Sequence, residues 1–148
     1  MKFRNYVLII IFVSIKVHAQ IPEGFNQLVL PKQPIVNQQI ESTHPEWRVS
    51  LEKNQHVLKS ITIYDGDPKE LASLVPDKTI KEKEKEKMYS VWTFESKSER
   101  NIWIKCEFTG TSISLSKSIP IGVKELRIYY NPNIIIDGNR QIEKVLYR

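Results

Sequence analysis

The stretch Ile102-Trp103-Ile104-Lys105-Cys106-Glu107-Phe108 places an apolar side chain at every second position. Successive side chains of a strand point to opposite faces, so Ile102, Ile104, Cys106 and Phe108 share one face. The sequence therefore predicts a half-buried β-strand here. Residues 88–94 and 112–115 show the same alternation, and the short connections 95–100 and 109–111 have the length of hairpin loops. We expect the three segments to form an antiparallel meander with one buried face.

Outside this region most of the chain also reads as short strands. The clearest is 56–64, where Val57, Ile61 and Ile63 are apolar positions of one face. Other predicted strands are 25–30, 35–40, 47–51, 126–130, 134–136 and 142–147, separated by turns such as 42–45, 131–133 and 137–139. Only 68–74 favours a helix, and Pro76 ends it. About eight short strands with at most one short helix predict an all-β or β-dominated fold, an antiparallel sandwich or barrel.

The N-terminus has the layout of a signal peptide. Lys2 and Arg4 precede an apolar run from residue 6 to residue 15, and Val17-His18-Ala19 supplies a small-residue cleavage site. The run is shorter than the roughly 20 residues that a membrane-spanning helix needs, so no retained membrane anchor is expected. We predict that residues 1–19 are removed and that 20–148 form one secreted β-rich domain, periplasmic or extracellular.

Charge gives little indication of a nucleic-acid partner. Without residues 1–19 the chain keeps 19 basic and 17 acidic residues, and its formal charge falls from +5 to +2. Nucleic-acid binding calls for a concentrated basic face. Lysine and glutamate alternate through 78–87, and adjacent opposite charges cancel beyond a Debye length of roughly 8 Å. We expect a charged loop or a sheet edge at 78–87; an electrostatic patch is the alternative.

The sequence presents no catalytic set and no cofactor site. Cys106 is the only cysteine, and we expect it to be buried, with a bridge between chains as the alternative. His44 and His56 are expected at the surface. No serine lies in a G-x-S-x-G motif, and zinc-ligand spacing is absent.

The segment Asp65-Gly66-Asp67-Pro68 admits two interpretations. Asp65 and Asp67, with Glu70 following, could hold calcium or a sugar and form the centre of a small hydrolase or metal-dependent enzyme. The same residues also describe a turn and a helix start, with Asp67 as N-cap and Pro68 at the first position. Aromatic side chains give two further candidates. We therefore propose as weak binding candidates Asp65, Asp67, Tyr64 and Tyr130; Tyr129 and Tyr130 are neighbours on a strand, so one of them must face outward.

Several pieces resemble a family of small secreted Gram-negative bacterial proteins of unknown function, named only after an enterobacterial locus tag. They are residues 61–68, 74–77, 91–94, 103–108 and 115–123, so the resemblance covers roughly residues 30–130. It implies an exported β-rich protein with no established activity. The family pattern has further cysteines where this chain has Leu30 and Leu126, which implies that apolar packing here replaces a disulfide.

Three functions are compatible with these features. The first is a non-catalytic envelope protein that binds another envelope or exported protein, as inhibitors and immunity proteins of cell-wall hydrolases do. The second is the enzyme centred on Asp65-Gly66-Asp67. The third is a structural envelope component that uses the charged segment 78–87 for weak association. Oligomeric state is not indicated.

Overall fold

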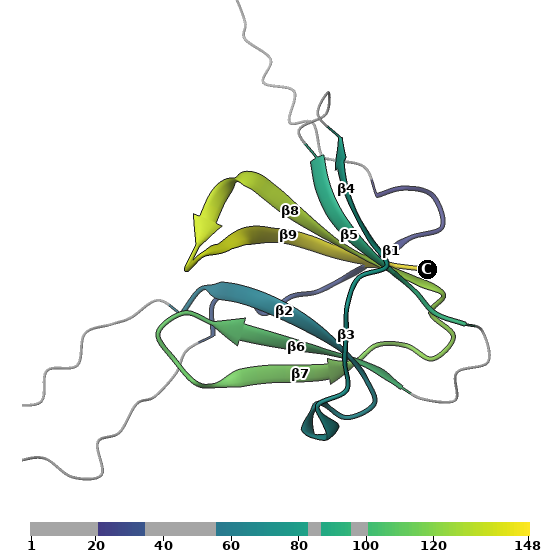
Figure 1. Ribbon diagram of the computed structural model, residues 1–148, viewed down its shortest axis with the longest axis horizontal. Helices are drawn as coiled ribbons and strands as arrows, with labels where there is room; N and C mark the ends of the chain where they lie inside the picture. Colours follow the sequence, from purple (N-terminus) through teal and green to yellow (C-terminus); the bar gives the residue numbers. More distant parts are fainter. Residues whose placement is uncertain (1–20, 35–55, 83–86, 96–100) are drawn as a thin grey trace, which may run out of the picture.

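The computed structural model describes residues 21–34, 56–82, 87–95 and 101–148. Within these ranges the chain forms nine strands and one short 3₁₀ helix: β1 Asn26–Leu28, β2 Leu58–Asp65, η1 Pro68–Glu70, β3 Ser73–Leu74, β4 Lys78–Glu82, β5 Lys87–Thr93, β6 Ile102–Phe108, β7 Ser114–Ser118, β8 Glu125–Ile136 and β9 Asn139–Tyr147. Sheet A has the order β1-β9-β8-β5-β4 and sheet B the order β3-β2-β6-β7, and all pairings are antiparallel (Figure 1). The predicted all-β sandwich is confirmed.

The hydrophobic core lies between the two sheets and uses one face of each. Sheet B contributes Ile63 and the alternating residues of β6, and sheet A contributes Leu126, Ile128 and Val145, which are completely buried. The strand 102–108 thus buries its alternate positions as the sequence predicts. Burial of this apolar surface is the main contribution to the stability of the sandwich.

Leu30 and Leu126, the positions at which the resemblance implies cysteines, both lie in apolar surroundings. Leu126 is 0% exposed in the core, and Leu30 packs against the core from the segment after β1. Both positions are thus apolar, and the replacement of a disulfide by packing stays an expectation from the resemblance.

The predicted meander of 88–94, 102–108 and 112–115 is wrong at its first connection. β5 pairs with β4 and β8 in sheet A, whereas β6 pairs with β2 and β7 in sheet B. The chain therefore crosses from one sheet to the other between β5 and β6. Both strands alternate, so the pattern alone does not distinguish a hairpin from two strands that face each other across a core. The second hairpin, β6–β7, forms as predicted.

The predicted turn at 131–133 is also wrong, because β8 continues through it. The ladder between β8 and β9 shifts register between Asn131 and Ile135, so Pro132 and Asn133 lie in a bulge rather than a turn. A proline is tolerated there because a bulge leaves ladder hydrogen bonds unmade. The hairpin closes at Asp137 and Gly138, whose φ angles of 47° and 79° fit a type I′ turn. Its tip is joined to β2 by an ion pair of 3.1 Å between Lys59 and Asp137.

The charged segment 78–87 contains the edge of sheet A. Its first part is β4, whose Thr79 hydroxyl bonds the Ser90 hydroxyl of β5 at 3.0 Å, and Lys87 begins β5. Lysines on an edge strand oppose pairing with another chain. The predicted strands 35–40 and 47–51, the turn 42–45, His44 and the signal peptide 1–19 lie outside the described residues.

Candidate functional site

The Asp65-Gly66-Asp67 turn has the geometry of a helix start. β2 ends at Asp65, and Gly66 adopts φ 99°, a conformation that glycine tolerates best. The Asp67 carboxylate accepts a hydrogen bond of 2.9 Å from the Lys69 amide, and Pro68 occupies the first position of η1. The interpretation of Asp67 as N-cap is confirmed.

A hollow of about 210 Å³ lies where β2 and β5 end. Its lining includes the carboxylates of Asp65, Asp77 and Glu95 beside Trp92 and Phe94. Trp92 is fixed by a bond of 3.2 Å from its indole nitrogen to the Leu74 carbonyl. Among the residues that the structure describes, no group of three His, Cys, Asp or Glu side chains is arranged to hold a metal ion. Asp65 thus lines a hollow with both acidic and apolar residues, whereas Asp67 caps η1.

The two groups most suited to nucleophilic or acid–base chemistry are buried. His56 is 4% exposed, and its Nδ1 lies 2.8 Å from the Thr109 carbonyl, so its predicted surface position is wrong. The residue instead links the segment before β2 to the segment after β6 in sheet B. Cys106 is buried as expected, and burial raises the pKa of its thiol to about 11. A thiol with this pKa is protonated at neutral pH and is a poor nucleophile.

The two tyrosines proposed from the sequence lie on different faces. Tyr64 is buried and pairs with Trp103 on the face of sheet B away from Ile63. Tyr130 packs against the core, and burial raises the pKa of its phenol. Its neighbour Tyr129 is the one that faces outward from sheet A. Binding roles for Tyr64, Asp65, Asp67 and Tyr130 stay predictions.

The outer face of sheet A carries a cluster that the sequence analysis did not identify. Leu126 and Ile128 point into the core, so Glu125, Arg127 and Tyr129 point to the opposite face. Register places Arg127 beside Val91 of β5 and Leu146 of β9, both of which are buried outside the core. Side chains above these residues therefore cover apolar surface.

Aromatic rings and cations alternate across this face. The rings of Tyr89 and Tyr129 stack with centroids 4.9 Å apart. The Arg127 guanidinium lies 4.5 Å from the centroid of Phe25 and 5.5 Å from that of Tyr89. Arg148 lies 4.9 Å from the Phe25 centroid, and Lys144 lies 5.1 Å from that of Tyr129. At these distances the cations are attracted to the ring faces. We call the set the aromatic–cation cluster: Phe25, Tyr89, Arg127, Tyr129, Lys144 and Arg148.

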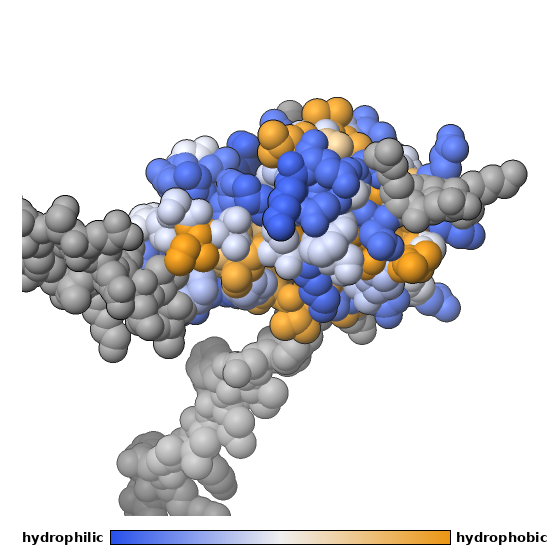
Figure 2. Space-filling model, turned by 90° about the horizontal axis from the view of Figure 1, so that it is seen from below, coloured by the Kyte–Doolittle hydropathy of each residue, from blue (hydrophilic) through white to orange (hydrophobic). Residues whose placement is uncertain are grey.

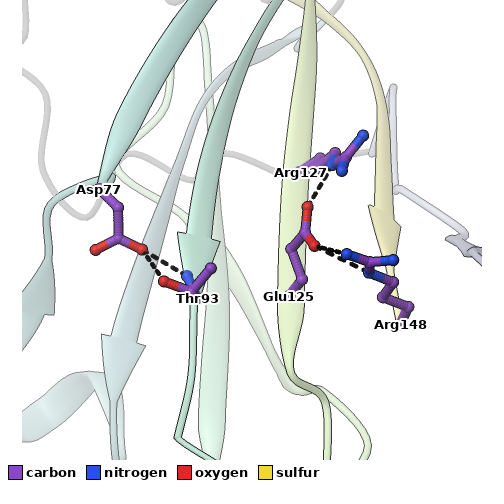
Figure 3. A network of polar contacts seen from close by, with 5 residues as sticks. All are labelled: Asp77, Thr93, Glu125, Arg127 and Arg148. Carbon is purple, nitrogen blue, oxygen red and sulfur yellow. Dashed lines mark hydrogen bonds and ion pairs between the residues drawn. The ribbon is translucent and has the colours of Figure 1, made fainter.

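Glu125 joins the two arginines of the cluster. Its Oε1 accepts from Arg127 Nε, and its Oε2 accepts from Nε and Nη2 of Arg148, the first of these at 2.9 Å (Figure 3). Partial burial opposes ionisation, but the hydrogen bonds from both arginines hold the pKa of Glu125 below its ordinary value. Burial likewise acts to lower the pKa of Arg127, and its bonds with Tyr129 and Glu125 raise it. The network therefore favours the charged forms of Glu125 and Arg127.

A second polar contact lies near this network, where β5 ends. Asp77 Oδ2 accepts hydrogen bonds from the hydroxyl and the amide of Thr93, the latter at 2.6 Å (Figure 3). These bonds hold the pKa of Asp77 below its ordinary value. Thr93 stands beside Glu125 in the β5–β8 ladder. The contact therefore fixes the segment that precedes β4 to the same end of sheet A.

Part of the cluster follows from the sequence. Arg127 and Tyr129 alternate with Leu126 and Ile128, which is the signal for an outward face. Phe25, Tyr89 and Arg148 come from distant segments, and only the sheet order brings them together. Their pairing with Arg127 could not be read from spacing.

Comparison with known protein families gives a match over most of the chain. The model of a family described as the type VI secretion system Tli immunity protein matches residues 36–144. No curated protein and no solved structure matches the chain. Within the described ranges, no helix has the length and apolar character that a membrane crossing requires. The sequence-based resemblance implied a family without an assigned activity, whereas the description of the matched family names a role.

Proposed function

The chain belongs to the type VI secretion system Tli immunity protein family, and we propose that it binds an effector protein and neutralises it without catalysing a reaction. The observation that carries this proposal is the family match over 36–144, a range that includes β2 to β8 and most of β9. The partner is then an exported protein that reaches the envelope. Binding by a folded surface fits a sandwich whose two sheets share one core.

The roles of the reactive side chains support a non-catalytic mode of action. His56 bonds a backbone carbonyl, Cys106 fills the core, and Asp67 caps η1. Each of these residues has a structural role at its position. Neutralisation by binding needs a complementary surface and no bond-breaking group.

We further propose that the chain acts outside the cytoplasm, as a single domain from residue 20. The signal-peptide layout of residues 1–19 supports this location. A protein purified from the periplasmic fraction should begin at Gln20 by intact-mass measurement. Recovery of the protein from the cytosol with Met1 to Ala19 still attached would contradict the proposed location.

The function is tested by protection and by direct binding. The probe is a type VI effector of the kind that this family neutralises, identified by its toxicity and produced in the periplasm of a susceptible strain. Co-expression of the full chain should restore growth, and the purified mature protein should bind the purified effector saturably in calorimetry. A chain without residues 2–19 should fold but fail to protect. Absence of both protection and binding by the exported chain would overturn the proposal.

A further inference from the structure

We propose that the aromatic–cation cluster on the outer face of sheet A is the surface that contacts the effector, and that it binds a patch of that protein rich in carboxylates. The inference rests on the proposed function and adds the site and the chemistry of the partner. Three observations carry it: the residue types in the cluster, the contacts that hold its side chains in place, and its excess of positive charge.

The composition matches that of residues that dominate binding energies at protein interfaces. Tyrosine and arginine are enriched among such residues, particularly where they are packed and partly desolvated. Tyr129 is 9% exposed, and its stacked partner Tyr89 is half-buried, as are Arg127 and Lys144. The cluster thus places partly exposed rings and cationic groups over the buried side chains of Val91 and Leu146.

The cations are held in place before a partner arrives. Arg127 is fixed by Phe25 and Tyr89 on its faces and by Glu125 at Nε. A guanidinium has five N–H donors, so the bonds to Glu125 and Tyr129 leave donors for an incoming carboxylate. Side chains that are already ordered lose less conformational entropy on binding. Because its guanidinium is already held in place, Arg127 favours recognition of a rigid, planar acceptor such as a carboxylate.

Charge selects the class of partner. Among the described residues, Arg127, Lys144 and Arg148 outnumber the two carboxylates that border them, Glu125 and the Glu82 that contacts Tyr89. Both oxygens of Glu125 are already occupied by the arginines. Lys144 adds a further positive charge above the Tyr129 ring. An acidic surface on the partner would increase the association rate with this face and form favourable contacts with it.

On the outer face of sheet B, the described side chains show no such excess of positive charge. Lys105 pairs with Glu107 at 3.1 Å, and Glu107 also accepts from the Ser60 hydroxyl at 2.8 Å. Its edge strand β7 turns the serines 114, 116 and 118 to the same side as Lys105. In the view of Figure 2, hydrophobic side chains form separate patches within hydrophilic surface. Lys105, half-buried on a central strand like Lys144, is therefore a matched control.

The test compares Lys144→Glu with Lys105→Glu in binding to the purified effector that the wild-type chain neutralises. Lys144→Glu should raise Kd by at least about 10-fold, and Lys105→Glu should change it by less than about 2-fold. Lys144→Gln, a milder change, should give an intermediate loss. Wild-type Kd should rise between about 50 and about 500 mM NaCl, with a shallower rise for Lys144→Glu. Melting temperatures and circular dichroism establish that each variant is folded.

The outcomes separate this inference from the proposed function. If the wild-type protein does not bind the effector, the proposed function fails, and the inference fails with it. If the wild-type protein binds and the folded Lys144 variants bind equally well, only the inference is overturned. The inference is also overturned if Lys144→Glu turns a dimer of this chain into monomers while the effector affinity is unchanged, because the face then pairs with a second copy.

Discussion

The carboxylate of Glu125, at the start of β8, accepts two hydrogen bonds from the guanidinium of Arg148, which directly follows β9 (Figure 3). Backbone bonds reinforce the contact, since the Arg148 amide donates to the Glu125 carbonyl at 3.0 Å and the Glu125 amide donates to the Arg148 carbonyl at 3.2 Å. The end of β9 is thereby fastened to the strand at the centre of sheet A. Arg127 approaches the same carboxylate from within β8, so one acidic group orders two cations of the cluster.

Replacing Glu125 by glutamine should reduce the free energy of unfolding at neutral pH by about 1–2 kcal/mol, because the charge-assisted bonds to two arginines are lost. Urea denaturation of the wild type and Glu125→Gln measures the difference. The pKa of Glu125 is lowered in the folded state, so its stabilisation is present above the unfolded pKa of about 4.3 and is lost as the pH falls through the folded pKa.

The difference between the two proteins should therefore be constant from about pH 6 to about pH 8 and shrink below about pH 4. A difference that persists unchanged in acid would show that Glu125 stabilises the sheet by shape rather than by charge. Glu107→Gln, on sheet B, serves as a comparison because its carboxylate also has a lowered pKa.

Cys106 should resist thiol reagents in the folded protein. With a pKa of about 11 and 3% exposure, it carries little thiolate at about pH 8 and is shielded by the core. Ellman's reagent should react at least about 100-fold faster in guanidinium chloride than in buffer. Rapid reaction of the native protein, or a disulfide-linked dimer on non-reducing gels, would mean that the thiol is accessible.

Truncation of Leu126 should destabilise the protein far more than truncation of an exposed isoleucine. Leu126→Ala removes methyl groups from a completely buried position, and core leucine-to-alanine changes cost about 2–5 kcal/mol. Ile135→Ala, at a position that is 59% exposed, should change the unfolding free energy by less than about 0.5 kcal/mol. Equal effects in chemical denaturation would contradict the assignment of the core.

The acidic turn should be dispensable for effector neutralisation. The triple variant Asp65→Ala, Asp67→Ala and Glu70→Ala loses the N-cap of η1, which costs about 1 kcal/mol. It should still fold and should still protect cells from the effector. A folded triple variant without protection would revive the interpretation of this turn as an active or binding site, and Asp67→Asn, which retains a capping oxygen, would separate the cap from the site.

Alternation allowed several strands and their buried faces to be predicted, among them 102–108, because one face of each sheet contacts the core. It identified Ile102, Ile104, Cys106 and Phe108 as inward residues, and all four are buried. It did not assign β5 and β6 to different sheets, because a strand with one buried face has the same alternating sequence pattern in either sheet. The bulge after Asn131 was missed for a related reason: Asn-Pro-Asn is typical of turns, and only pairing with β9 extends the strand through it.

The aromatic–cation cluster shows where sequence reasoning ends. The sequence left open which of Tyr129 and Tyr130 faces outward, and the rings that pack against Arg127 come from β5 and from the segment before β1. Tyr130 was proposed and lies against the core, whereas Tyr129 stacks on the outer face. Which of the two tyrosines faces outward depends on which alternate residues of β8 point into the core. Leu126 and Ile128 are completely buried, so Tyr130 lies on their side of the sheet and Tyr129 on the other.

Titration of a fixed amount of active effector with increasing amounts of the mature protein tests the central claim most directly. A binding immunity protein should abolish effector activity at a fixed molar ratio, with inhibition proportional to the amount added below that ratio and unchanged by longer incubation. Complete inactivation by far less than one equivalent, progressing with time, would contradict the account, because it would show that the chain acts as a catalyst.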